Sequence, residues 1–147
     1  MIILAENLSL KAFVITMKAS KALEELTKKD IKNHGMRASD FAILEALYHK
    51  GRQTIREISE SVLISTGSIT YVIDKLEKKE LLIRTNCPDD RRAVYLEITA
   101  KGKQMMDEIF PKHQQVIEEM FQGISESDKA TVIEVLKKVG HQAAEKE

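Results

Sequence analysis

A chain of 147 residues is long enough for one domain with a hydrophobic core, and nothing in it requires a second independent domain. Its single cysteine excludes an internal disulfide, and no paired cysteines or closely spaced Cys/His set indicates structural zinc. No apolar stretch approaches membrane-spanning length and no signal-peptide pattern is present, so we expect a cytoplasmic protein without a membrane partner.

The 23 basic and 23 acidic residues cancel, but they are unevenly distributed. Residues 1–49 carry a net charge of +1, residues 50–103 carry +3 and residues 104–147 carry −4. A basic middle segment is compatible with a surface that faces DNA, and an acidic end with helices that face solvent. The excess of +3 is small for such a surface.

Two helices are predicted in the first third of the chain. Apolar residues recur at helical spacing over 8–34, and Gly35 is placed to end this helix in the left-handed conformation. Ser39 is expected to cap a second helix, which continues to about Lys50 and is closed by Gly51.

The next two predicted helices are short and are separated by a sharp turn. The first begins at Thr54, whose hydroxyl can cap the backbone while Glu57 reaches back, as in a capping box. Residues 62–64 form a compact apolar turn, and Ser65 is expected to cap a second helix that runs to about Lys79. The apolar face of this second helix consists of Ile69, Val72, Ile73 and Leu76.

Two strand patterns follow around a charged loop. Residues 81–84 and 93–98 are predicted as strands, and apolar side chains alternate along the second. The connecting loop, residues 86–92, contains the paired arginines Arg91 and Arg92. A pair of short helices followed by such a hairpin is a winged helix-turn-helix, so the predicted fold class is mainly α with a small β wing.

Two more helices are predicted beyond the wing. Thr99 is placed to start a long one, in which Pro111 predicts a kink or a break because proline removes a backbone hydrogen bond. Gly123 begins a turn, and Ser125 or Ser127 is expected to cap a last helix with a wide apolar stripe.

Small and polar residues crowd the first two turns of the second short helix. Hydroxyls, an exposed backbone and one aromatic ring can enter a major groove and touch base edges, whereas the alternative is an ordinary solvated helix face. The wing favours DNA binding, because an arginine there can reach phosphate or a narrow minor groove while an aspartate holds its guanidinium in a two-pronged ion pair. The residues predicted to face DNA are Ser65, Thr66, Gly67, Ser68, Thr70 and Tyr71 on the helix and Asp90, Arg91 and Arg92 on the wing.

Three spaced motifs carry a resemblance to a known family. They are Leu76-Glu77-Lys78-Lys79-Glu80-Leu81, Asp90-Arg91-Arg92 and Ile98-Thr99-Ala100-Lys101-Gly102. From Ser39 to Gly102 the chain resembles the MarR family of bacterial and archaeal transcription regulators, whose pattern has a Leu-Glu-x-x-Gly-Leu hinge, an Asp-x-Arg wing and a closing Leu-Thr-x-x-Gly. Ile98 replaces a leucine and Glu80 replaces the hinge glycine, which costs about 1 kcal/mol in a left-handed conformation.

The resemblance implies a homodimer whose interlocked terminal helices present two recognition helices to a pseudo-palindromic operator. The physical argument agrees, because the long apolar helix faces have little to bury against in one chain and a symmetric dimer matches symmetric DNA. The alternative is a monomer with an ordinary helical core. We expect residues 1–38 and 99–147 to form a helical dimerisation region and residues 39–98 to form the winged helix-turn-helix.

No pattern points to catalysis. The sequence has no nucleophile, base and orienting group at a suitable spacing and no phosphate-binding glycine loop, and its four histidines are scattered singly. His34 and His113 are placed to approach one another as metal ligands, but a lone helical histidine is far more often a surface or core residue. We therefore expect no enzyme, no cofactor and no metal.

The resemblance also implies an effector, a small aromatic or phenolic anion bound in a crevice between the dimer helices and the winged domain. His34, Met36, Arg37 and Met106 are expected there, since an arginine suits an anion and methionines adapt to varied shapes. The alternative is that they only pack an interface. Cys87, where the first strand enters the wing, is a second candidate trigger because nearby arginines can favour its thiolate, and the alternative is an inert, shielded thiol.

The sequence thus predicts a homodimeric repressor that leaves its operator on binding a small aromatic ligand or on thiol modification. The competing interpretation is a winged-helix module that contacts other proteins. A steep loss of duplex affinity with rising salt distinguishes the first, because released counterions set that slope.

Overall fold

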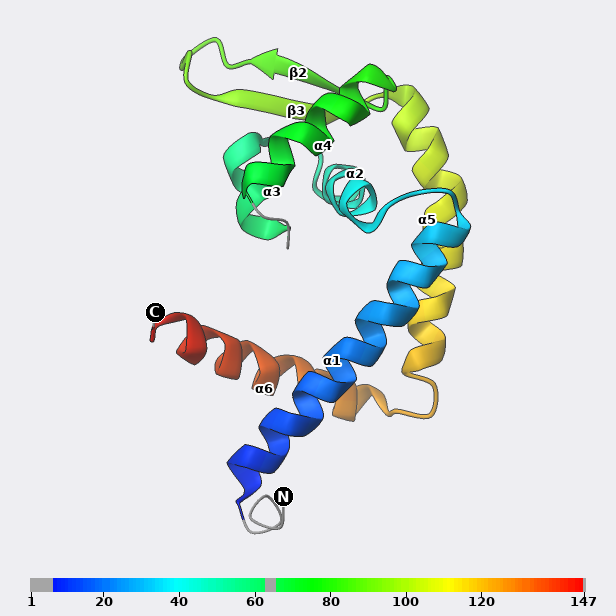
Figure 1. Ribbon diagram of the computed structural model, residues 1–147, viewed down its shortest axis with the longest axis vertical. Coiled ribbons are helices and arrows are strands. Elements are labelled where there is room, and N and C mark those ends of the chain that lie inside the picture. The colour runs from blue at the N-terminus through cyan, green and yellow to red at the C-terminus, as the bar shows by residue number, and fades with distance from the viewer. Residues whose placement is uncertain (1–6, 63–65, 147) are drawn as a thin grey trace. The chain divides into compact units, whose positions relative to one another are not determined.

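The computed structural model describes residues 7–62 and 66–146, which form six helices and a small antiparallel sheet (Figure 1). The predicted fold class, mainly α with a small β wing, is confirmed. Two compact units are distinguished, residues 1–116 and residues 117–147. None of the helices in the described ranges combines the length and apolarity that a membrane span requires.

The helices and strands lie close to the predicted ranges. The first unit contains α1 (Leu8–Asn33), α2 (Ala38–Lys50), β1 (Gln53–Thr54), α3 (Ile55–Ser61), α4 (Thr66–Lys78), β2 (Leu82–Asn86), β3 (Val94–Ile98) and most of α5 (Ala100–Met120). The second unit contains the end of α5 and all of α6 (Glu126–Ala144).

Several helix ends are fixed by the residues that the sequence indicates. Gly35 and Gly51 follow α1 and α2 with φ of 77°, the left-handed conformation that glycine adopts without steric penalty. The Thr54 hydroxyl accepts a hydrogen bond from the backbone N–H three residues on, at 3.0 Å, and the Ser125 hydroxyl does the same at the start of α6. The capping hydroxyls and the glycines with positive φ therefore set the starts and ends of these helices.

The structure departs from the predicted elements at several points. α2 begins at Ala38, one residue before the expected cap at Ser39, and Arg37 at the N-cap position makes no side-chain cap bond. α5 continues through Pro111 without a break, because proline removes one hydrogen bond while the neighbouring turns keep theirs. β1 was not predicted, since two residues are too short to show an alternating pattern.

The sheet has the order β1-β3-β2 with both pairs antiparallel. Leu82 pairs with Ile98 at the base of the hairpin, and Asn86 pairs with Val94 near its tip. β2 therefore extends two residues beyond the predicted end at Arg84, because ladder pairing to β3 overrides the polarity of these residues. The wing is a closed hairpin with a short loop.

One hydrophobic core organises the first unit. The predicted apolar face of α4 is confirmed, since Ile69, Val72, Ile73 and Leu76 are all buried. The polar face of the same helix is therefore turned away from the core. The largest fully buried side chains are Ile43, Leu44, Leu47, Ile58, Ile73, Leu76, Leu82, Leu96 and Met106.

The turn after α4 joins this helix to the sheet and to α5. Glu80 has φ of 63°, so the left-handed conformation expected at the hinge is present without a glycine. The Leu81 N–H donates to the Leu76 carbonyl at 3.0 Å, as in the usual left-handed helix end. Thr99 holds the turn from outside, because its hydroxyl donates to the Glu80 carbonyl at 2.6 Å and its N–H donates to the Leu81 carbonyl at 3.1 Å.

Gly102 allows α5 to approach this turn. A Cβ atom at Gly102 would lie 2.3 Å from the Leu81 carbonyl oxygen and 2.8 Å from Cγ1 of Ile98. The Gly102 N–H also donates to the Thr99 hydroxyl at 3.0 Å. The closing Thr99-x-x-Gly102 motif thus allows α5 to pack closely against the turn that follows α4.

Gly102→Ala is expected to lower the free energy of unfolding by about 2–3 kcal/mol, because the new methyl group collides with main-chain atoms that cannot move independently. Gly140→Ala is the matched control, since nothing lies within 4 Å of a Cβ there and alanine favours the α6 helix. Urea unfolding followed by circular dichroism measures both variants. Equal stabilities would contradict the close approach.

Each unit leaves an apolar helix face exposed. On α1 the exposed side chains are Leu8, Leu10, Phe13, Ile15, Met17, Leu23 and Leu26. On α6 they are Val132, Ile133, Val135, Leu136 and Val139. So many exposed apolar side chains on two helices are unusual for a monomer in water and mark surfaces that bind something.

Candidate nucleic-acid interface

The face of α4 that is turned away from the core carries polar and aromatic side chains. Ser68 and Thr70 are exposed, and Tyr71 is 64% exposed despite its size. Residues 66–67 form the first positions of α4, whereas Ser65, the predicted cap and DNA contact, lies outside the described residues. The predicted helical DNA contacts that the structure describes thus share the first turns of one helix.

The wing carries two exposed arginines. Neither Arg91 nor Arg92 forms an ion pair with an acidic residue in the described part of the chain. The predicted two-pronged pair with Asp90 is not what the structure has, because the Asp90 carboxylate accepts the backbone N–H of Arg92 at 2.9 Å. An aspartate two residues before that amide closes a local turn, so Asp90 shapes the loop and leaves both guanidinium groups free.

Arg84 joins the wing to α4. Its Nη1 lies 2.8 Å from Glu77 Oε1, its backbone N–H donates to Glu77 Oε2 at 3.2 Å, and its guanidinium also pairs with Asp74. The hydrogen bond to Asp74 is the largest cause that raises the pKa of Arg84, so the guanidinium stays charged. The Glu77 carboxylate therefore holds α4 and the sheet together as one body.

Cys87 is half-buried and directly follows β2, where the chain enters the wing loop. A hydrogen bond with its thiol is the main cause that raises the pKa of Tyr95, and the Arg52 guanidinium carbon lies 4.5 Å from the centroid of the Tyr95 ring. Arg84, one of the arginines expected to favour the thiolate, is engaged by Asp74 and Glu77 instead. These contacts agree with the shielded alternative, and thiol sensing stays a prediction.

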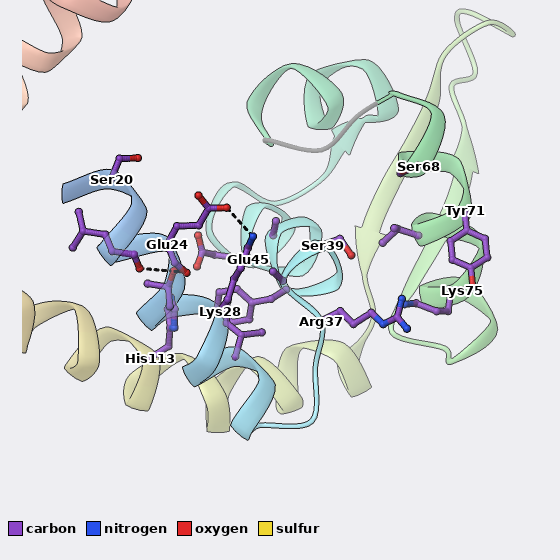
Figure 2. A pocket seen from close by; sticks show the side chains of 17 residues that line it. Ser20, Glu24, Lys28, Arg37, Ser39, Glu45, Ser68, Tyr71, Lys75 and His113 are labelled. Carbon is purple, nitrogen blue, oxygen red and sulfur yellow. Dashed lines mark hydrogen bonds and ion pairs between the residues drawn. The ribbon is translucent and has the colours of Figure 1, made fainter. Parts of the chain in front are cut away.

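A pocket of about 960 Å³ opens between α1, α2, α4 and α5 within the first unit (Figure 2). Leu23, Ile31, Phe41 and Val72 contribute apolar walls. Its charged lining includes Lys28, which pairs with Glu24 at 2.7 Å, together with Arg37 and Lys75. This mixture of apolar walls and a few polar groups suits a small organic ligand.

Of the four residues predicted for a ligand crevice, Arg37 lines this pocket. Met106 is fully buried, so it packs in the core and does not reach the pocket wall. Met36 packs half-buried against the same core, and the His34 imidazole faces Asp30, with Nε2 3.6 Å from Oδ1. The sequence predicted Tyr71 as a DNA contact and did not place it, or the residues of α1, beside a pocket, because no periodicity indicates which surfaces face one another across a pocket.

His113, for which the sequence favoured a surface or core position over a metal site, is a buried residue paired with a carboxylate. Its Nδ1 lies 3.0 Å from Asp30 Oδ2, so His34 and His113 converge on the two oxygens of one carboxylate. His113 is 4% exposed and its ring centroid is 4.6 Å from that of Phe41. The imidazole is therefore a buried and oriented polar group on the wall of the pocket.

Comparison with known proteins shows which family this chain belongs to. The MarR family profile matches residues 36–94. Over 132 residues the chain is 45% identical to the HTH-type transcriptional regulator MhqR of Bacillus subtilis (strain 168), an alignment that covers 90% of this chain and 91% of MhqR. The chain belongs to the MarR family. It is therefore a DNA-binding transcription regulator and not an enzyme.

Two solved structures share the fold. Sco3205 of Streptomyces coelicolor, in complex with DNA, superposes with a TM-score of 0.80 at 18% identity, covering 89% of this chain and 84% of Sco3205. NadR in complex with 4-hydroxyphenylacetate superposes with a TM-score of 0.76 at 19% identity, covering 86% of this chain and 89% of NadR. Both likenesses concern the fold alone.

In this MarR-family chain an ion pair holds α4 against α2. Lys75 Nζ lies 2.8 Å from Asp40 Oδ1, and Asp40 is 4% exposed. A buried carboxylate without its cation is strongly unfavourable, because the charge keeps no water shell. Lys75 thus holds α4 against α2 at the edge of the pocket.

Lys75→Met is expected to lower the free energy of unfolding by about 2 kcal/mol, since it leaves Asp40 buried without a cation. Lys78→Met on the same helix is the control, because that side chain is exposed and its loss changes the net charge equally. Chemical denaturation at neutral pH compares the two. A loss as small as that of the control would show that the pair adds nothing to stability.

Proposed function

We propose that this MarR-family protein is a homodimeric repressor, that it binds a pseudo-palindromic operator in a sequence-specific manner, and that a small aromatic anion releases it. The observation that carries the DNA-binding part is the exposed polar face of α4 beside a wing with two exposed arginines. No acidic residue in the described ranges neutralises these arginines, so both are available to phosphate.

In this proposal α4 enters the major groove. Ser68, Thr70 and Tyr71 meet base edges, and residues 65–67 approach the DNA backbone or bases at the start of the helix. Arg92 reaches the minor groove or a phosphate, and Arg91 contacts phosphate more loosely. The link through Arg84 supports docking of helix and wing as one body, because neither can rotate without breaking two ion pairs.

Removal of Arg92 tests this docking mode. Arg92→Ala is expected to weaken operator binding roughly tenfold or more, because it removes a phosphate or minor-groove contact. Thr70→Ala and Tyr71→Ala are expected to change sequence preference, since a base contact is worth about 1–3 kcal/mol. Lys138→Ala, which removes the same charge from exposed α6, is the control.

The measurement is fluorescence anisotropy at fixed salt with a duplex selected by the purified protein from random fragments. Unchanged affinity in Arg92→Ala together with unchanged preference in both helix variants would rule out the docking mode. A salt titration of the wild type addresses the protein-contact alternative. That alternative predicts a flat salt dependence, whereas phosphate contacts predict a steep one.

The dimer part of the proposal is supported by the exposed apolar faces of α1 and α6. A second copy of the chain is the partner of the right chemistry, because a two-fold axis brings identical apolar faces together and sets two copies of α4 about 10 bp apart on DNA. The domain division proposed from the sequence, with residues 1–38 and 99–147 as the dimerisation region, agrees with this arrangement.

Phe13→Glu tests the dimer. Phe13 is 63% exposed on the apolar face of α1, so a charge there is expected to shift the protein to monomers at micromolar concentration and to weaken operator binding at least tenfold. Lys11→Glu is the control, because helical spacing places it on the other side of α1. Sedimentation velocity gives the readout, and a folded wild-type monomer that binds the operator tightly would overturn the dimer.

The ligand part is supported by the pocket of about 960 Å³, whose walls are apolar and which contains the Arg37 guanidinium. NadR was solved with 4-hydroxyphenylacetate, an aromatic anion of the class proposed for this chain. A ligand wedged between α1, α2 and α4 would displace α4 and so lower DNA affinity. Modification of Cys87 is the second proposed route of release, through added bulk in the wing.

A further inference from the structure

We propose that Arg37 and Lys78 bind DNA phosphates, with Arg37 on the flank of α4 that lies opposite the wing and Lys78 at the end of the helix. The inference rests on the proposed entry of α4 into the major groove, and it adds a second line of backbone contacts to those of the wing. Two phosphate strands border a major groove, so a helix that lies in it has one strand on each flank. The wing can serve only the flank on which it lies.

Ion pairs show which flank of α4 faces the wing and which faces α2. On one flank, Asp74 and Glu77 of α4 bind Arg84 of β2. On the other flank, Lys75 binds Asp40, near the start of α2, at 2.8 Å. Glu77 and Lys75 lie about 160° apart around the helix axis. The wing and the start of α2 therefore lie on opposite flanks of α4.

Arg37 stands on the flank that faces α2. It directly precedes α2, it is exposed, and it lines the pocket on the side of α4 together with Tyr71 and Lys75 (Figure 2). Its side chain makes no cap bond to α2 and no ion pair with an acidic residue in the described ranges. The guanidinium is thus available, and its planar shape suits the two-pronged binding of a phosphate.

Lys78 extends the exposed face of α4 toward the end of the helix. It follows Tyr71 by seven positions, a spacing that places both side chains on one face. The advance along the axis is about 10 Å, comparable with the roughly 12 Å width of a major groove. Asp74, the acidic residue one turn before Lys78, is held by Arg84, and Lys78 has no acidic partner in the described part of the chain. Lys78 can therefore reach phosphates at the edge of the groove while Tyr71 touches bases.

Variants that remove one charge each test these contacts in the full-length protein. Arg37→Gln and Lys78→Gln are each expected to weaken binding to the duplex selected from random fragments roughly fivefold at physiological salt. Each should also reduce the steepness of log affinity against log salt by about 0.9 for every copy of the chain on the duplex, because one phosphate contact fewer releases fewer counterions. Sequence preference should not change, since phosphates carry no sequence information.

Two controls separate a local contact from a general effect of charge. Lys50→Gln removes the same charge from the exposed far end of α2 and is expected to keep the wild-type salt dependence. Arg37→Lys keeps the charge and is also expected to keep the salt dependence, because lysine binds phosphate as a point charge. Thermal melts verify that each variant is folded. The titrations contain no small aromatic anion, because Arg37 also lines the pocket.

A wild-type salt dependence in either Arg37→Gln or Lys78→Gln would overturn the inference, and so would an equal loss in Lys50→Gln. If Arg92→Ala still weakens binding in that case, the proposed docking of α4 and the wing stands. If neither Arg92→Ala nor the two glutamine variants weaken binding, the inference and the docking mode both fail.

Discussion

The main-chain carbonyl of Leu81 is the point where α4, the sheet and α5 meet. It accepts the Thr99 N–H at 3.1 Å, and α5 passes so close that a Cβ on Gly102 would lie 2.3 Å away. Thr99 also holds the Glu80 carbonyl, so the left-handed turn is supported from outside and tolerates a non-glycine residue at φ of 63°. The direction of α4 relative to the wing thus depends on these backbone contacts.

Charged residues around α4 fall into two groups. Arg84 and Lys75 form ion pairs within the protein. Arg84 binds Glu77 and holds α4 to the sheet, and Lys75 binds Asp40 and holds α4 to α2. Arg91 and Arg92 have no acidic partner in the described ranges and remain exposed. A chain with zero net charge can therefore still present a local positive surface, because paired charges neutralise one another while the unpaired arginines of the wing stay exposed.

Local chemistry was readable from the sequence. The caps at Thr54 and Ser125, the left-handed Gly35 and the strained Glu80 depend on residues within a few positions of one another, so spacing alone predicts them. The apolar face of α4 follows from helical periodicity. The same short-range motifs carry the resemblance to the MarR family, which was confirmed. Short-range rules failed at Ser39 and Pro111, where neighbouring turns outweighed one residue.

The tertiary structure alone decided which distant groups meet. Asp30 and His113 are 83 positions apart, and their contact depends on how α1 and α5 pack against α2. The same holds for β1, whose two residues form a strand only because β3 lies beside them. It also holds for Met106, which is buried in the hydrophobic core. Sequence determined the helices, their faces and the wing, because these follow from interactions within a turn or a hairpin. The pocket and its buried histidine arise from packing between elements, which no local pattern records.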